Sequence, residues 1–411
     1  MSKLLEQINT ESRIGSIKDL VFPVSNTYDF SNKDKVVFVN TGDVHEGKFI
    51  HKNYSSTKKL PGQAKKIIEF GDIVFSEIRP KNRHFALVDF DSKDYVVSTK
   101  LIVLRIKENI DPRFAYIVLT ADQNLREFQN IAESRSGTFP QITFEAIADY
   151  EVNIPDLPTQ KKIAEILGAY DAKIENNNKI IKNLEATAQA IFNEWFVNFR
   201  FPGHEKVKMV DSEMGEIPEK WRVGRLSELL KVKHGFAFSG NKFKNEGIYP
   251  VIKIKNILEN NTVNLDKVDF IDINDFGGIL ENFEIFNGDI LIAMTGATSG
   301  KIAVLMDNYD RYFLNQRVGK FEFLKEENRW FSYIYLTQEQ NRNLLLTMSD
   351  GSAQGNLSPK QVENLETIIP DEIILKLFNK IIKSMFENKF FLQLENNELK
   401  ESRNQLLAKL I

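Results

Sequence analysis

The chain has 411 residues, a net charge of −3 and 42% hydrophobic residues, and it contains no cysteine. One hydrophobic core rarely organises a chain of this length, so at least two domains are expected. The hydrophobic content excludes an intrinsically disordered chain. The lack of cysteine excludes disulfides and thiolate metal sites, and it is typical of a reducing compartment.

Residues 1–20 contain no apolar segment of signal-peptide length, and the chain has no run of about 18 apolar residues. We therefore expect a cytoplasmic protein without a membrane partner. The five histidines are not spaced as metal ligands: His45, His51, His84, His204 and His234. No nuclease or methyltransferase motif stands out. The sequence thus predicts neither catalytic residues nor a metal site.

The first module, residues 1–155, is predicted to be rich in β-strands. Short apolar runs are separated by Gly, Pro, Asn and Asp, which is typical of strands joined by turns. These runs lie at 36–39, 72–75, 85–88, 95–97 and 101–104. Residues 112–130 have a helical pattern.

Residues 156–197 are predicted to form one long helix. Pro158 and Thr159 provide a start signal, because proline is tolerated in the first turn and the Thr159 hydroxyl can accept a hydrogen bond from one of the unpaired N–H groups there. Apolar residues then recur in alternating steps of four and three, which is typical of a coiled-coil seam. They are Ile163, Leu167, Tyr170, Ile174, Ile181, Leu184, Ala188, Ile191 and Trp195, with Asn177 as the polar interruption.

The second half repeats the first. Gly71-Asp72-Ile73-Val74 corresponds to Gly288-Asp289-Ile290-Leu291, and the same shift of 217 residues pairs Tyr116 with Tyr333. Residues 198–221, with two glycines and two prolines, are predicted to be a linker. Residues 222–369 form the second module, and residues 370–411 form the second long helix. Its seam is Phe378, Ile382, Met385, Leu392, Leu399, Leu406 and Leu410, interrupted by Lys389, Asn396 and Arg403.

The order of segments predicts the fold. The second helix can cover its seam within the chain only by running antiparallel to the first. The fold class is therefore α+β, with two similar, strand-rich globular modules at opposite ends of a long antiparallel coiled coil and an internal pseudo-twofold repeat. With the midpoints of the two seams aligned, facing residues have numbers that sum to 573, which places Asn177 opposite Asn396. Pairing with the helices of a second copy of the chain is the alternative.

Two lysine-rich runs without acidic residues suit a phosphate backbone. One lies at 47–68 and the other at 229–245, and we expect them at equivalent places in the two modules. Solvated lysine faces are the alternative.

The loop 296–301 carries two glycines and a lysine, but it has three residues between the glycines where a phosphate-binding P-loop needs four. Its counterpart at 78–84 is basic. Loops with one scaffold and different polar residues are typical of recognition loops, although variable surface turns would also fit. Ser98-Thr99-Lys100 corresponds to Asn315-Gln316-Arg317, whose side chains can pair with base edges, and Gly137-Thr138 corresponds to Gly351-Ser352.

The candidate DNA-contacting residues in the first module are Lys58, Lys59, Arg79, Lys81, Asn82, Arg83, Lys100 and Thr138. Those in the second module are Lys242, Thr295, Thr298, Ser299, Lys301, Asn315, Gln316, Arg317 and Ser352.

The chain resembles the specificity subunit of type I restriction-modification systems over essentially its whole length. Five stretches carry the resemblance. They are Leu157-Pro158-Thr159-Gln160 opening the long helix, Phe192-Asn193-Glu194-Trp195-Phe196 closing it, Gly288-Asp289-Ile290-Leu291 with the loop that follows, Asn315-Gln316-Arg317, and Asp211-Ser212-Glu213-Met214-Gly215-Glu216-Ile217-Pro218.

The resemblance implies a non-catalytic subunit that binds a bipartite, asymmetric site on double-stranded DNA, one half per module. Two methyltransferase subunits would dock on its helices, and two motor-nuclease subunits would join for cleavage. S-adenosylmethionine, ATP and Mg²⁺ would be bound by those partners and not by this chain. The alternatives are a two-module coiled-coil scaffold that binds only proteins and an enzyme with an unrecognised site.

Overall fold

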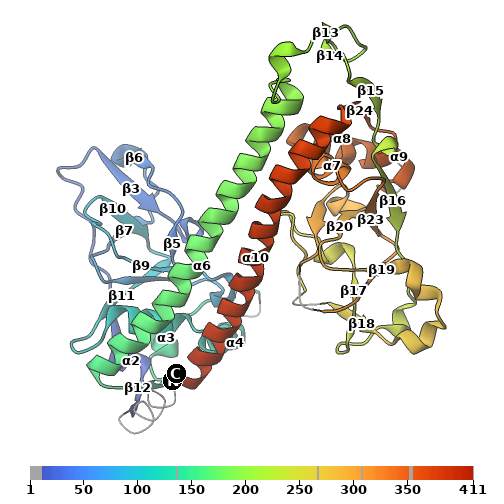
Figure 1. Ribbon diagram of the computed structural model, residues 1–411. Helices are drawn as coiled ribbons and strands as arrows, with labels where there is room; N and C mark the ends of the chain where they lie inside the picture. Colours follow the sequence, from blue (N-terminus) through green and yellow to red (C-terminus); the bar gives the residue numbers. More distant parts are fainter. Residues whose placement is uncertain (1–11, 136–137, 266–267, 307–308, 351–354, 411) are drawn as a thin grey trace. The chain divides into compact units, whose positions relative to one another are not determined.

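The computed structural model describes residues 12–135, 138–265, 268–306, 309–350 and 355–410 (Figure 1). The chain forms two compact units. Unit 1 comprises residues 1–174 and 399–411, and unit 2 comprises residues 175–398. Each unit therefore contains one strand-rich module together with a part of each long helix.

Unit 1 contains two four-stranded sheets and two short antiparallel pairs. The first sheet has the order β6-β3-β10-β7, in which β3 and β10 are parallel. Its strands are β6 (Tyr54–Ser56), β3 (Lys35–Val39), β10 (Tyr95–Ser98) and β7 (Ala64–Ile67). The second sheet, β2-β11-β8-β9, is antiparallel, with β2 (Val21–Val24), β11 (Leu101–Ile106), β8 (Ile73–Ser76) and β9 (Phe85–Leu87). The short pairs are β1 (Arg13–Ser16) with β12 (Glu151–Ile154) and β4 (Val44–His45) with β5 (Lys48–Phe49).

The second sheet is the middle layer of unit 1. Successive side chains of a strand point to opposite faces. Accordingly, Ile73 and Phe75 of β8 belong to the core shared with the helices, whereas Val74 between them belongs to the core between the two sheets. The helices are α2 (Ile17–Leu20), α3 (Pro112–Thr120), α4 (Asp122–Arg135) and α5 (Phe144–Ile147). Because both faces are covered, every residue of β8 is buried.

Unit 2 repeats both four-stranded sheets of unit 1 with the same strand order, which confirms the predicted internal repeat. Its sheets have the orders β18-β17-β22-β19 and β16-β23-β20-β21, and β17 and β22 are again the parallel pair. The first sheet consists of β18 (Asp269–Ile271), β17 (Tyr249–Ile252), β22 (Tyr312–Leu314) and β19 (Glu284–Ile285). The second consists of β16 (Leu230–His234), β23 (Val318–Phe323), β20 (Ile290–Ala293) and β21 (Ile302–Val304), and β15 (Arg222–Arg225) pairs with β24 (Glu366–Ile369).

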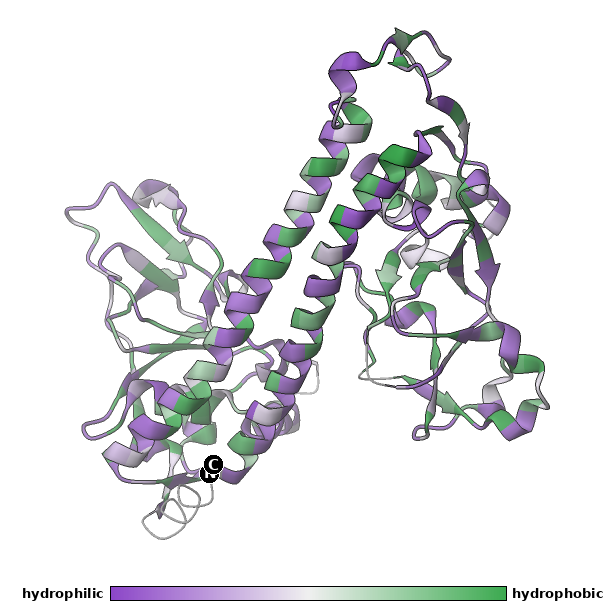
Figure 2. Ribbon diagram, in the orientation of Figure 1, coloured by the Kyte–Doolittle hydropathy of each residue, from purple (hydrophilic) through white to green (hydrophobic). Residues whose placement is uncertain are grey.

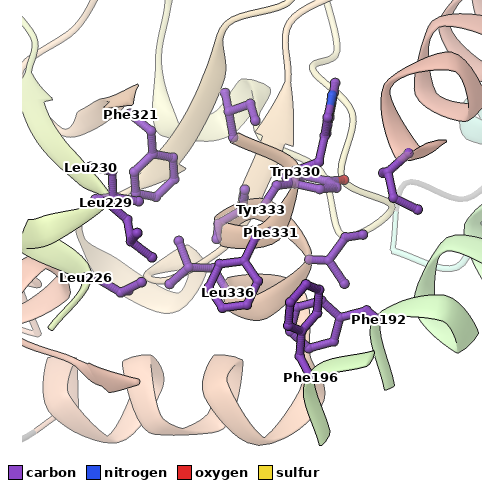
Figure 3. Packing of buried hydrophobic residues seen from close by; sticks show 14 of the residues in the cluster. Phe192, Phe196, Leu226, Leu229, Leu230, Phe321, Trp330, Phe331, Tyr333 and Leu336 are labelled. Atoms are coloured by element: carbon purple, nitrogen blue, oxygen red, sulfur yellow. The ribbon is translucent and has the colours of Figure 1, made fainter. Parts of the chain in front are cut away.

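The helices of unit 2 also follow the order of unit 1. They are α7 (Asn328–Thr337), α8 (Glu339–Asp350) and α9 (Pro359–Glu363). Figure 3 shows how α7 fills the core, with Trp330 and Phe331 between the sheet residue Phe321 and Phe192 of the first long helix. The aromatic rings of Phe331 and Phe196 are 4.8 Å apart between centroids. The module and the helical part of unit 2 thus share one hydrophobic core.

The first long helix is α6 (Leu157–Phe192), continued by a π-helical turn, η4 (Asn193–Val197), and the second is α10 (Glu372–Leu410). Hydrophobic residues recur along both helices among hydrophilic ones (Figure 2). The start of α6 corrects one detail of the sequence analysis. The Asp156 carboxylate, and not the Thr159 hydroxyl, caps the helix, because it accepts a hydrogen bond of 3.1 Å from the Thr159 amide.

The predicted register of the two helices is confirmed. In unit 2 the rings of Trp195 and Phe378 lie 5.8 Å apart, and Asn177 Nδ2 donates to Asn396 Oδ1 at 2.9 Å. Residue numbers therefore rise along α6 as they fall along α10, so the helices are antiparallel. In unit 1, Leu167 of α6 shares a core with Leu406 of α10.

Residues 198–221, predicted to be a linker, also contribute a hairpin and core residues to unit 2. They contain a short hairpin, β13 (Met209–Val210) with β14 (Ile217–Pro218), and the side chains of Phe201 and Trp221 are stacked and buried in the core of unit 2. The compact units divide each long helix. The five-segment division made from the sequence therefore stays a prediction about domain boundaries.

Candidate nucleic-acid interface

Three segments of unit 1 that are distant in sequence meet at the end of β8. The amide of Glu77 donates to the carbonyl of Lys100, which lies in the turn between β10 and β11. The amide of Arg79 donates to the carbonyl of Pro140, and the amide of Ile142 donates to the carbonyl of Glu77, at 3.1 and 2.8 Å. The loop after β8, the β10–β11 turn and residues 138–142 therefore form one framework.

Unit 2 builds the same framework at the end of β20. The amide of Met294 donates to the carbonyl of Arg317 at 2.9 Å, that of Gly296 to Gly355 at 3.2 Å, and that of Leu357 to Met294 at 2.8 Å. Each bond has its counterpart in unit 1. The loop after β20, the turn 315–317 and residues 355–357 thus correspond to the three segments of unit 1.

This framework brings together most of the residues singled out from the sequence. In unit 1 it joins the basic loop with Lys100 and the exposed Thr138. In unit 2 it joins the loop of Thr295, Thr298, Ser299 and Lys301 with the turn of Asn315, Gln316 and Arg317. Ser352 lies outside the described residues. Lys58 and Lys59 are exposed in a separate turn, η2 (Thr57–Lys59), which none of these hydrogen bonds joins to the framework.

The cations of the unit 1 loop differ in how strongly acidic neighbours hold them. Arg83 is held by two carboxylates, with Nε 2.6 Å from Glu46 and Nη1 2.5 Å from Asp122. Lys81 lies 3.5 Å from Glu133. Arg79 is exposed and makes no ion pair with any described residue. Arg79 is therefore the cation of this loop that is best placed to reach a ligand.

The backbone of this loop is unusual. Arg79 and Arg83 flank a short 3-10 turn, η3 (Pro80–Asn82), and both have positive φ angles, of 43° and 58°. Residues other than glycine rarely adopt this conformation, and they keep it where the surroundings enforce it, often at functional sites. Here the bonds to Pro140, Glu46 and Asp122 enforce it. The loop is thus preorganised.

A partly buried lysine supports the turn of unit 1 between β10 and β11. Lys66 Nζ donates to the carbonyls of Thr99 and Leu101 at 3.1 and 2.8 Å. Burial lowers its pKa. Lys66, which belongs to the first lysine run, therefore supports the turn that carries Lys100 and is not available to a phosphate.

The loop of unit 2 is less charged and more buried. Thr295 and Ser299 are buried, and the Thr298 hydroxyl donates to the carbonyl of Thr295. Lys301 is paired with Glu259. Gln316 and Arg317 in the neighbouring turn are exposed. The two units therefore present different polar groups on the same backbone framework.

Sequence reasoning missed a glycine that makes this turn possible. A side chain on Gly235 would place its Cβ 2.2 Å from the carbonyl oxygen of Leu314, which backbone atoms do not tolerate. Phe236 beside it donates its amide to Leu314 and accepts a bond from the amide of Gln316. The glycine follows β16, in which apolar and basic residues alternate, but its neighbour lies about 80 residues further along the chain, so no local signal marks it.

The prediction that the two lysine runs occupy equivalent places is wrong. Lys231 and Lys233 lie on β16, which pairs with β23 as β2 pairs with β11, whereas the run at 47–68 follows β4. The second run is also neutralised by acids from other segments. Lys233 lies 2.6 Å from Glu322, and Lys242 lies 3.2 Å from Asp275. The lysine run at 229–245 contains no acidic residue, but acidic residues from other segments lie beside it in the folded structure.

The comparisons with known proteins agree with this geometry. The sequence profile of the family described as the type I restriction modification DNA specificity domain matches residues 11–186 and 218–401. The chain belongs to the type I restriction-modification specificity family. The specificity subunit of the type I restriction enzyme HindI from Haemophilus influenzae is 32% identical, over 96% of this chain and 98% of its own length. That of MjaIX from Methanocaldococcus jannaschii is 28% identical over 68% of this chain and 63% of the relative.

The fold agrees as well. The crystal structure of the type I restriction-modification system S subunit from M. genitalium has a TM-score of 0.61 and 16% identity, with 98% of this chain and 97% of that chain covered. The relatives are specificity subunits, which confirms the prediction of a non-catalytic component. Among the described residues, no group of three His, Asp or Glu could hold a metal ion. In that same part of the chain, no helix is long and apolar enough to cross a membrane.

Proposed function

We propose that the chain reads a bipartite, asymmetric site on double-stranded DNA, with one half-site bound by each unit. The observation that carries the proposal is the recurrence of one hydrogen-bonded framework of three segments with different polar residues in the two units. Two units with the same backbone framework but different side chains are suited to bind two different DNA half-sites. Arg79 in unit 1 and Asn315, Gln316 and Arg317 in unit 2 carry groups that can pair with base edges.

The long helices would dock two methyltransferase subunits, and two motor-nuclease subunits would complete the cleaving complex. One feature of α10 supports this. Ile373, Leu377 and Ile381 are exposed at four-residue spacing, so they form an apolar stripe on one side of the helix. S-adenosylmethionine, ATP and Mg²⁺ would be bound by these partners.

Mapping of methylated adenines tests the reading function. In a host that carries the chain and its methyltransferase, methylation is expected at one asymmetric bipartite sequence, and a host with the methyltransferase alone provides the control. Methylation that does not depend on the chain, together with no DNA binding by the assembled complex at any salt concentration, would favour a scaffold that binds only proteins.

Substitution of the stripe tests the docking surface. Leu377→Asp combined with Ile381→Asp should abolish copurification of the methyltransferase, because two carboxylates would be buried without partners. Lys383→Asp changes an exposed position of the same helix outside the stripe and should have little effect. Equal retention of the methyltransferase by both variants would place the docking surface elsewhere.

A further inference from the structure

Glu259 bridges two cations beside the recognition loop of unit 2. Its Oε1 lies 2.6 Å from Lys301 Nζ, and its Oε2 accepts a hydrogen bond of 2.8 Å from Arg342 Nη2. Lys301 closes the loop after β20, and Arg342 belongs to α8. The hydrogen bonds from Lys301 and Arg342 lower the pKa of Glu259. The carboxylate is thus ionised and divides its two oxygens between two cations.

The exposures of the three side chains are unequal. The Glu259 side chain is 68% exposed, whereas those of Lys301 and Arg342 are 18% and 30% exposed. The cations are therefore fixed in the surface of unit 2, and the carboxylate covers them from the solvent side. An exposed ion pair of this kind contributes little to stability.

Unit 1 has a carboxylate in the equivalent position. Glu46 and Glu259 each follow a short 3-10 turn by three residues, η1 (Thr41–Asp43) and η8 (Ile254–Asn256), and the two turns are capped alike by Asp43 and Asn256. Glu46 contacts Arg83 of the unit 1 loop. In both units, therefore, a glutamate from the same place in the fold contacts a basic residue of the recognition loop.

The two sites differ in what an anion would have to displace. In unit 1, Asp122 also binds Arg83, so two carboxylates satisfy one guanidinium. In unit 2, a single carboxylate serves two cations. A phosphodiester, like a carboxylate, offers two anionic oxygens, and both lysine and arginine bind phosphate. One incoming phosphate can therefore replace Glu259 without leaving either cation unpaired.

We propose that Lys301 and Arg342 form a binding site for a backbone phosphate of DNA, which Glu259 fills until DNA binds. The proposal rests on the DNA reading proposed above and adds Arg342 and Glu259 to the residues that take part. Since phosphates carry no sequence information, this site sets the position and affinity of unit 2 on the duplex and not its specificity.

Removal of the competing carboxylate should strengthen binding. Glu259→Gln keeps the shape of the side chain, and we expect the Kd for DNA to fall by about two- to fivefold, the range that corresponds to an exposed ion pair. The gain should be equal for the recognised sequence and for unrelated DNA. Lys301→Gln and Arg342→Gln should each weaken binding and lower the slope of log K against log salt by about 1.

Glu372 offers a matched control. It lies at the start of α10 and also bridges two lysines, at 2.6 Å from Lys325 and 2.7 Å from Lys376. Glu372→Gln thus removes the same charge from a similar cluster that is not part of the recognition loop. It should leave the Kd unchanged.

The experiment measures DNA binding by the full chain in its complex with the methyltransferase, across a salt series, together with the melting temperature of each variant in inorganic phosphate. Phosphate should raise the melting temperature of Glu259→Gln more than that of the wild type. Unchanged or weaker DNA binding by Glu259→Gln would overturn the proposal. Stabilisation by phosphate without any DNA binding by the wild type would support an anion site but refute both its DNA ligand and the reading function.

Discussion

Asn177 and Asn396 form a hydrogen bond across the two long helices, with Nδ2 of Asn177 2.9 Å from Oδ1 of Asn396. Both side chains are buried in seams that are otherwise mainly apolar. Asn396 donates in turn to Asn178, and Asn177 donates also to Glu395. Oδ1 of Asn177 has no hydrogen-bond partner among the residues that the structure describes. The pair is therefore costly in stability, but a register slipped by one heptad would place the Asn396 amide opposite Tyr170 or Leu184.

Replacement of both asparagines tests this role. Asn177→Leu with Asn396→Leu should raise the free energy of unfolding by about 1–2 kcal/mol, because an unsatisfied buried oxygen is removed. Either single substitution should be destabilising, because it removes the bond between the two amides and leaves Oδ1 of Asn396 or one N–H of Asn177 without its partner. Thermal melting of the three variants ranks their stabilities. A destabilised double variant would show that the pair holds the helices together and does not merely align them.

The helices should also set the spacing between the two half-sites. One heptad inserted at matched levels in α6, between Tyr170 and Leu184, and in α10 keeps both seams intact and lengthens them by about 10 Å. At 3.4 Å per base pair, the unread spacer should grow by about three base pairs while both half-sites stay the same. Methylome mapping of the variant reads the spacer directly, and an unchanged spacer would refute the helices as a ruler.

Lys389 interrupts the seam of α10, and its side chain is 2% exposed, 2.6 Å from Glu185 and beside the ring of Phe386. Glu185→Ala would leave a buried ammonium without a counter-ion. We expect it to cost about 2–3 kcal/mol, less than for a fully buried pair because Glu185 is partly exposed. Lys389→Met removes the charge and should stay within about 1 kcal/mol of the wild type. Denaturant titrations compare the two variants, and equal losses would contradict this asymmetry.

The basic loop of unit 1 should contain one reader and one positioning residue. Arg79→Ala should weaken the complex by about 1–3 kcal/mol at one half-site only, as expected for loss of a paired contact to a base. Arg83→Ala should give a similar loss and also lower the melting temperature, because Glu46 and Asp122 then lose their partner. A uniform loss on all DNA sequences with Arg79→Ala, with a shallower salt slope, would make Arg79 a phosphate contact.

Periodicity within each segment was sufficient to predict the long helices. The order of the segments gave their antiparallel direction, and alignment of the two seams gave the Asn177–Asn396 level. The internal repeat could also be predicted from the sequence, since corresponding strands recur at a nearly constant shift in residue number. The partners of the seam interruptions were not predictable. Lys389 and Arg403 pair with Glu185 and Asp171, which lie beside the seam of α6 and not in it.

The ion-pair partners of the lysines could not be predicted from the sequence. Lys242 stands in a lysine-rich run and Lys301 in a loop without acidic residues, yet Asp275 and Glu259 neutralise them from segments more than 30 residues away. Strand pairing decides these neighbours, and no local pattern encodes it. Arg342 was missed for the same reason, because it lies on a mainly polar helix and becomes notable only beside Lys301 and Glu259.

An exchange of one module tests the central claim most directly. Residues 14–155 would be replaced by the corresponding module of another specificity subunit, with both long helices unchanged, and the methylated adenines of the host would be mapped by single-molecule sequencing. If each unit binds one half-site, the sequence of one half-site should change completely, while the other half-site and the spacer stay the same. A site in which both half-sites change, or in which neither does, would contradict this division between the units.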